Sequence, residues 1–271
     1  MKVHIYKYTC LTNLHVGSGD VNYNIIDNEV ERDPITNYPM IHASGVKGAM
    51  REHFSGLPEE TLNRIFGAPP KHKEAITAGS YKFLDAKFLS RPMRLGGDTD
   101  SSAISVVSLA AVNDYLRQLT AFGVNHYGIP EIRLEEAAFG DYQFLTNHNQ
   151  KISNEGEKPK ISIEGEATDW LPAETAAQLK KLSDVLGEFF AVAKDIDQYQ
   201  LPVMARNYLE NGVSKNLWYE EVVPHGSVFY QMILTPDGKM DLDLESGPIQ
   251  FGGNASIGCG YIRIEKLGGT V

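Results

Sequence analysis

The sequence predicts an α+β fold with an antiparallel sheet, and three observations support this. Segments with strand-like alternation, or rich in β-branched and aromatic residues, lie at about 2–12, 80–89, 160–168, 226–234 and 260–266. Helical periodicity lies near 44–54, 58–66, 108–119 and 173–194. These segments do not alternate as the βαβ units of a parallel sheet do, so helices packed on an antiparallel sheet are expected.

Composition is that of a folded protein. The chain has 271 residues, of which 42% are hydrophobic and 22% charged, with 25 basic and 35 acidic side chains and a net charge of −10. The absence of an 18-residue apolar run argues against a spanning helix, and neither cysteine belongs to a CxxC pair. We expect a cytoplasmic protein with no membrane partner. The acidic balance disfavours a simple nucleic-acid binder but leaves room for a local basic patch.

The segment 44–54 has the clearest local signal. Ser44 is expected to be the N-cap of a helix on which Lys47 and Arg51 stand one turn apart, beside Gly45 and Gly48. Cations and close backbone near a helix N-terminus suit a phosphate group. The alternative is an ordinary amphipathic helix with charges on its exposed face.

Two glycine-rich segments are candidates for close approach to a ligand. Neither the segment 14–20 nor the segment 248–261 is a nucleotide loop of the usual kind. The first is not followed by a helix, and Cys259 stands where the lysine of a phosphate loop is needed. A plain turn remains the alternative for the first.

An acidic segment and a hairpin complete the candidates. Four acids fall within residues 27–33, where a carboxylate could bind a divalent metal or accept a proton, although charge runs are commonly just solvated. Asn211-Gly212 predicts a tight hairpin turn. The arms mix aromatic and basic side chains, which suits base stacking beside a phosphate backbone and equally suits packing on a core.

Taken together and in order, these segments resemble one family. The quoted segments are Leu14-His15-Val16-Gly17-Ser18-Gly19, Ile26-Asp27-Asn28, residues 32–41, residues 44–51, residues 85–94, residues 217–224 and the glycine-rich end. They resemble the RAMP superfamily, and specifically the repeated Cas7-type backbone subunit of type III CRISPR effector complexes in its Cmr (type III-B) form. The related Csm backbone subunit is the near alternative. The matches run from about residue 9 to 263.

The resemblance implies one RAMP domain over residues 1–271, with a modified RRM or ferredoxin-like palm. A β-hairpin thumb over about 200–224 and a variable insertion over about 140–165 would be inserted in it. Copies would stack into a filament along a guide RNA, together with other effector subunits and a target RNA. The guide backbone would be held by Ser44, Lys47, Arg51, Gly252, Gly253 and Asn254. The thumb and target residues would be Arg206, Tyr208, Asn211, Gly212, Lys215, Trp218 and Tyr219.

The resemblance also implies an endoribonuclease. Asp27 matches the family's catalytic aspartate and is the expected ligand of a divalent metal, Mg²⁺, with His15, Glu220 and Glu221 as auxiliary candidates. The implied reaction is attack of a ribose 2′-OH on the adjacent phosphate. A structural RNA-binding backbone with an inert Asp27 is the first alternative. The second is an enzyme that uses the glycine loops to bind a small phosphorylated substrate.

Overall fold

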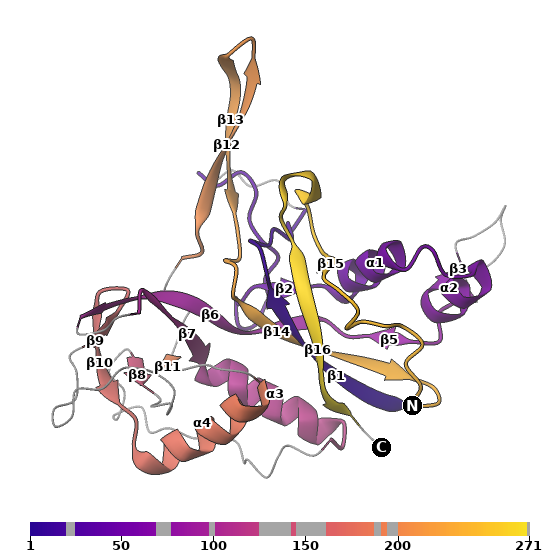
Figure 1. The fold of residues 1–271 in the computed structure, drawn as a ribbon, viewed down its shortest axis with the longest axis horizontal. Helices are drawn as coiled ribbons and strands as arrows, with labels where there is room; N and C mark the ends of the chain where they lie inside the picture. The colour runs from indigo at the N-terminus through magenta and orange to yellow at the C-terminus, as the bar shows by residue number, and fades with distance from the viewer. Residues whose placement is uncertain are drawn as a thin grey trace. The chain divides into compact units, whose positions relative to one another are not determined.

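The computed structural model describes residues 1–19, 25–68, 77–97, 101–124, 142–144, 161–186, 191–193 and 200–269. The chain is a mixed α/β structure, as predicted at the level of class (Figure 1). Its contacts divide it into two compact units. Unit 1 comprises Met1–Phe88, Gln200–His225 and Phe229–Val271, and unit 2 comprises Leu89–Tyr199 and Gly226–Val228. Every predicted site residue lies in unit 1.

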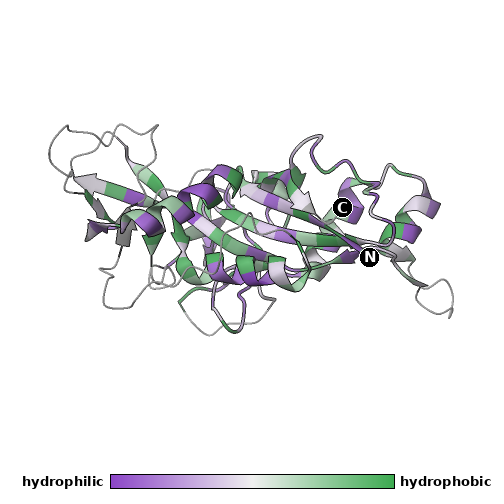
Figure 2. Cartoon of the chain, turned by 90° about the horizontal axis from the view of Figure 1, so that it is seen from below, coloured by the Kyte–Doolittle hydropathy of each residue, from purple (hydrophilic) through white to green (hydrophobic). Residues whose placement is uncertain are grey.

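The core of unit 1 is a sheet in which the strands β15 (Ile249–Gln250), β16 (Tyr261–Gly269), β1 (Lys2–Cys10) and β14 (Val228–Thr235) lie in that order. The pairing of β1 with β16 is antiparallel. Burial alternates along β16, where Ile262 and Ile264 are buried and Tyr261 and Arg263 are exposed. Figure 2 shows hydrophobic and hydrophilic residues alternating along the strands. The short strand β2 (Met40–Ile41) pairs with β6 (Ala86–Gly97). The short strand β5 (Lys82–Phe83) pairs with β14.

Two predicted helices of unit 1 are confirmed. They are α1 (Ala43–His53) and α2 (Glu59–Phe66). The strand β3 (Gly67–Ala68) follows α2 and pairs with β4 (Thr77–Ala78). Val46 and Met50, one turn apart on α1, are fully buried. The opposite side of α1 is exposed. No helix among the described residues is long and apolar enough to cross a membrane.

The predicted hairpin is present. Strands β12 (Val203–Glu210) and β13 (Val213–Glu221) pair antiparallel and form a two-stranded sheet of their own. Asn211 and Gly212 both have positive φ, 52° and 77°, as the tight hairpin turn requires. The arms are exposed over most of their length and extend away from the rest of unit 1 (Figure 1).

Unit 2 contains α3 (Leu109–Ala121) and α4 (Ala173–Leu186). Its strands are part of β6, β7 (Ala103–Ser108), β8 (Tyr142–Phe144), β9 (Ile161–Ile163), β10 (Glu166–Trp170) and β11 (Ala191–Ala193). The helix predicted over 173–194 is wrong at its end, because Ala191–Ala193 is a buried strand parallel to β7. A three-residue apolar run has no periodicity that separates strand from helix. Much of the predicted insertion at 140–165 lies outside the described residues.

The start of α1 also differs from the prediction. His42 occupies the N-cap position without a capping side chain, and Ser44 lies inside the helix. The free N–H of Ala43 instead donates to Asp85 Oδ1 at 2.7 Å, and His42 Nδ1 lies 3.3 Å from the same oxygen. A carboxylate from the loop before β6 therefore takes the place of a local cap, where it also favours the helix dipole.

This difference can be tested by substitution. Asp85→Ala should lower the free energy of unfolding by about 1 kcal/mol, because it removes the only described side-chain acceptor at the start of α1. Ser44→Ala should change it by less than about 0.5 kcal/mol, because Ser44 caps nothing. Urea unfolding of the two variants measures both values. A larger loss for Ser44→Ala than for Asp85→Ala would contradict the assignment.

Candidate functional site

Asp27 is attached by its backbone and its side chain to the root of the hairpin. The N–H groups of Asp27 and Asn28 donate to the carbonyl of Tyr219 at 3.1 Å, and the N–H of Tyr219 donates to Asp27 Oδ2 at 2.8 Å. Glu221 N–H donates to the carbonyl of Asn28 at 2.9 Å. The carboxylate of Asp27 is exposed, and no described residue bonds to its second oxygen, Oδ1. Asp27 is thus fixed in direction with one oxygen open to solvent.

Glu220, the next residue on β13, is buried beside three donors. Trp218 Nε1 donates to Oε1 at 2.9 Å, and Arg206 Nε and Asn254 Nδ2 donate to Oε2 at 3.1 and 2.8 Å. Burial by itself raises the pKa of this carboxyl. The hydrogen bonds from Trp218, Arg206 and Asn254 and the nearby His15 outweigh burial, so the pKa lies below its ordinary value. Glu220 is therefore a charged acceptor at neutral pH, with both oxygens in use.

Glu221 and His15 form a second buried layer. Glu221 pairs with Arg32 through Oε1 and accepts the N–H of Val30 at 3.1 Å through Oε2. His15 Nδ1 lies 2.7 Å from the carbonyl oxygen of Glu221. These contacts bring Asp27, His15, Glu220 and Glu221 to one region, the hairpin root.

The glycine-rich turn closes on the same region. The N–H of Gly253 donates to the carbonyl of His15 at 2.9 Å. Gly252 has a φ of 73°, and a Cβ there would collide with that carbonyl oxygen, so only glycine allows the approach. Asn254 has a φ of 63° and directs its amide to Glu220. Gly253 and Asn254 therefore belong structurally to the hairpin root.

The predicted thumb residues divide into two groups. Arg206 and Trp218 face Glu220, and Arg206 Nη2 also lies 3.8 Å from Cys259 Sγ. The others lie exposed along the arms or at the tip, namely Tyr208, Asn211, Gly212, Lys215 and Tyr219. Lys215 is 3.7 Å from Glu210 in an exposed pair, which holds it only weakly. The exposed group is available to a partner, whereas the first group holds the root.

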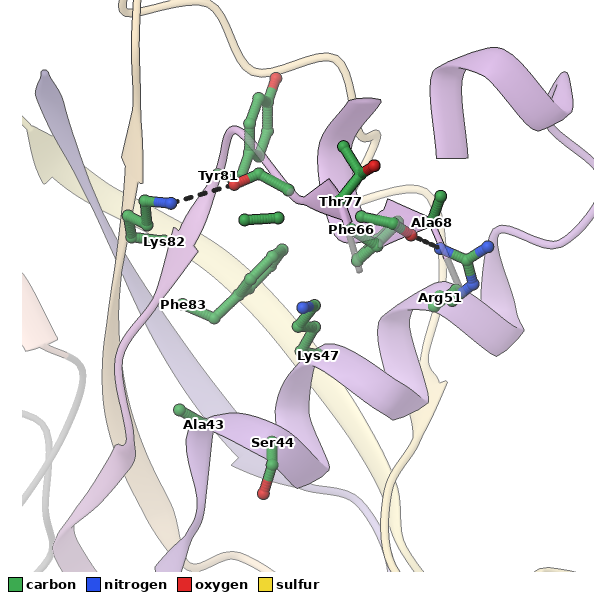
Figure 3. A pocket seen from close by; sticks show the side chains of 13 residues that line it. Ala43, Ser44, Lys47, Arg51, Phe66, Ala68, Thr77, Tyr81, Lys82 and Phe83 are labelled. Atoms are coloured by element: carbon green, nitrogen blue, oxygen red, sulfur yellow. Dashed lines mark hydrogen bonds between the residues drawn. The ribbon is translucent and has the colours of Figure 1, made fainter. Parts of the chain in front are cut away.

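Ser44, Lys47 and Arg51 border a pocket of about 660 Å³ beside α1 (Figure 3). Lys47 rises from the helix into this pocket, whereas the hydroxyl of Ser44 points away from it. The Arg51 guanidinium donates to the carbonyl of Gly67 at 2.8 Å and to Asn63 Oδ1 at 3.0 Å. Arg51 is thus engaged in joining α1 to the end of α2. No described residue forms an ion pair with Lys47, whose ammonium group is open to an anion.

The six predicted guide-binding residues do not form one site. Gly252 borders a separate pocket of about 420 Å³ with Gly45 and Gly48, on another face of α1 from Lys47. The two faces follow from the helical period, because residues 44, 47 and 51 share one side and residues 45, 48 and 52 the next. An extended polyanion could follow α1 across both faces, but a small ligand could not contact both.

The residues at the hairpin root do not form a metal site of their own. Asp27 offers one open oxygen, while the oxygens of Glu220 and Glu221 are all engaged by protein donors. Among the described residues, no three His, Cys, Asp or Glu side chains gather as a metal would require. Asp27, the predicted metal ligand, therefore offers a metal only one open oxygen, Oδ1.

Two residues of this region had no predicted role. Arg32 neutralises Glu221 from 189 positions away along the chain, and Asp85 caps α1. The separation in sequence hides both contacts, because neither periodicity nor spacing reports a pair that only the folded chain brings together.

Comparisons with known proteins show to which family the chain belongs. The RAMP superfamily matches residues 7–263. The chain belongs to the RAMP superfamily. The CRISPR system Cmr endoribonuclease Cmr4 of Pyrococcus furiosus is 26% identical, over 97% of this chain and 95% of that protein. The Cms endoribonuclease Csm3 of Enterococcus italicus is 33% identical, but over 30% of this chain and 44% of that protein.

Solved Cmr structures share the fold. The crystal structure of oligomeric Cmr4 from Pyrococcus furiosus aligns with a TM-score of 0.69 at 21% identity, over 99% of this chain and all of that one. The type III-B Cmr-beta complex bound to cognate target RNA contains a chain that aligns with a TM-score of 0.71 at 20% identity, over 98% and 97%. The predicted resemblance to the Cmr form is confirmed, and the Csm relative matches a smaller share of the chain.

The lowered pKa of Glu220 predicts how stability depends on pH. A carboxyl whose folded pKa lies below its ordinary value of 4.5 stabilises the fold above that pH and loses this contribution as pH falls through the folded pKa. As pH falls below about 5, the free energy of unfolding should therefore fall more steeply in the wild type than in Glu220→Gln. Urea unfolding at a series of pH values measures both slopes. Equal slopes would mean that Glu220 is not stabilised in its charged form.

Proposed function

We propose that this chain is a backbone subunit of a type III CRISPR complex that binds guide RNA and cleaves complementary target RNA. The observation that carries the proposal is Asp27, whose exposed carboxylate is oriented by the N–H of Tyr219 at the root of a projecting hairpin. The name of its relative from Pyrococcus furiosus, a Cmr endoribonuclease, gives the reaction class. The partners would be guide RNA, target RNA, further copies of this chain and other subunits.

The proposed chemistry needs one proton acceptor and a distorted RNA backbone. The 2′-OH of a target ribose loses its proton to Asp27 Oδ1, the 2′ oxygen bonds to the adjacent phosphorus, and the bond to the 5′ oxygen breaks. The leaving 5′ oxygen takes a proton from water. The products are a 2′,3′-cyclic phosphate and a 5′-OH. Attack requires the 2′ oxygen in line with the leaving oxygen, which regular A-form RNA does not allow. The hairpin, acting as a thumb on an RRM-like palm, would displace a nucleotide and supply this geometry.

A divalent cation fits this proposal only as a partner of the RNA. Because Asp27, Glu220 and Glu221 together offer one open carboxylate oxygen, which the proton transfer uses, Mg²⁺ would be held chiefly by RNA phosphates beside Asp27. The cation would supply neutralisation of the RNA backbone there. The proton transfer above runs through Asp27 alone.

Asp27→Asn tests the catalytic role. Asparagine keeps the size and one acceptor oxygen for the N–H of Tyr219 but cannot take a proton, so target cleavage should fall by at least about 100-fold. The measurement is a denaturing gel of end-labelled target RNA incubated with the reconstituted complex.

The control is Asp243→Asn, which makes the same charge change at an exposed position of unit 1. The control should cleave as the wild type does. If Asp27→Asn cleaves at the wild-type rate, Asp27 is inert. If no complex cleaves although a mobility shift shows bound target, the chain is a structural backbone.

Lys47→Ala tests the guide contact. Removing an open cation from α1 should weaken guide retention and reduce the slope of log affinity against log salt by about one. Filter binding at several salt concentrations measures the slope. Lys181→Ala, an exposed lysine of α4 in unit 2, is the matched control and should leave the slope unchanged. Identical slopes for Lys47→Ala and the wild type would remove Lys47 from the guide interface.

A further inference from the structure

We propose that Glu220 is a positioning residue that sets the hairpin and the glycine-rich turn in place relative to Asp27, without touching RNA. The inference rests on the proposed function, because it concerns the same cleavage site. It differs from the auxiliary catalytic role that the resemblance implies for Glu220.

Tyr219 connects Glu220 with Asp27. The N–H and the carbonyl of Tyr219 both bond to the Asp27 segment, and Glu220 follows Tyr219 on β13. Successive side chains of a strand point to opposite faces. The Glu220 carboxylate therefore acts on the face of the hairpin opposite to the side chain of Tyr219. A shift of Glu220 along or about β13 moves the peptide that holds Asp27.

Three segments meet at the Glu220 carboxylate. Arg206 comes from β12, Trp218 from β13 and Asn254 from the glycine-rich turn, and all three donate to it within 3.1 Å. Arg206 and Trp218 are direct cross-strand partners, so they present their donors from one face of the hairpin. Arg206 Nη2 makes a further contact with Cys259 Sγ at 3.8 Å. The carboxylate thus connects both arms of the hairpin with the turn.

The same contacts argue against Glu220 as a general base. The residue is only 6% exposed, and both of its oxygens already accept hydrogen bonds. A general base needs an open lone pair within reach of the substrate hydroxyl. Asp27, by contrast, is exposed and has Oδ1 open.

The hairpin depends on its root for direction. Its two strands form a separate sheet and are exposed over most of their length. A two-stranded ribbon without a packed face has little rigidity of its own. Displacing a nucleotide beside Asp27 with the hairpin requires a root that resists bending, and Glu220 supplies the buried, charge-assisted contacts there.

Glu220→Gln in the reconstituted complex is the test. The amide keeps the size of the side chain but places an NH₂ group among three donors, so the link should loosen. Single-turnover cleavage should fall on the order of 10- to 100-fold, while guide and target affinities stay within about twofold of wild type. Cleavage products should spread to neighbouring positions on the gel. Glu174→Gln is the matched control, because it makes the same charge change at an exposed position of α4 in unit 2, outside the hairpin.

Three further measurements test the positioning role against proton transfer and general unfolding. The pH dependence of the residual cleavage should keep the wild-type shape, whereas loss of one limb would assign Glu220 a proton. Trp218 fluorescence, read in a Trp170→Phe background because the chain has two tryptophans, should shift to the red in Glu220→Gln and not in Glu174→Gln. Asn254→Ala should slow cleavage too, and combining it with Glu220→Gln should add little, because both break one link.

The outcomes distinguish the two proposals. Wild-type cleavage at wild-type positions by Glu220→Gln would overturn the positioning role and leave the proposed function intact. An inactive wild-type complex, with bound target, would instead overturn the proposed function. Equal losses of cleavage and of target affinity in Glu220→Gln would mean that Glu220 serves binding, which also overturns the inference.

Discussion

The hairpin root depends on one buried carboxylate and the donors around it. Taking Glu220 out of water is costly, and removing one partner of a buried, hydrogen-bonded charge leaves the other uncompensated. Arg206, Trp218 and Asn254 offset that cost only when β12, β13 and the glycine-rich turn are all in place. The lowered pKa of Glu220 shows that these contacts more than offset the cost of burying its charge, and they favour one arrangement of the three segments. The orientation of the Asp27 carboxylate depends on this arrangement, because the carboxylate accepts a hydrogen bond from the neighbouring N–H of Tyr219.

Helix α1 shows how one short element serves both folding and binding. Val46 and Met50 anchor it in the core, and Arg51 ties it to the carbonyl of Gly67 after α2. Lys47, one turn before Arg51, is left without an ion partner among the described residues. Two cations that look equivalent in the sequence thus have different availability. The difference lies in whether backbone acceptors lie within reach of the side chain, which depends on where α2 ends.

The sequence predicts what is local and fails where contacts are long-range. Asn211-Gly212 predicts the hairpin because few residues accept positive φ, and the periodicity of α1 and α2 reflects their buried sides. Ser44 is misassigned as a cap because the true acceptor, Asp85, arrives from a distant loop. The site follows the same rule. Order along the chain indicates Asp27 and Glu220, but not that Glu220 is engaged by Asn254, 34 residues later.

A net charge of −10 is compatible with RNA binding because two of the acids at the hairpin root are already paired with arginines. Glu220 is paired with Arg206 and Glu221 with Arg32. Charges farther away than about 8 Å are screened at physiological salt, so the field at the root follows these pairs and not the sum over the chain. Asp27 is then the carboxylate there whose charge is not offset by a described cation. An RNA backbone brought to this point meets one proton acceptor beside two carboxylates that are already paired with arginines. That arrangement lets an acidic chain approach a polyanion and still present a base to it.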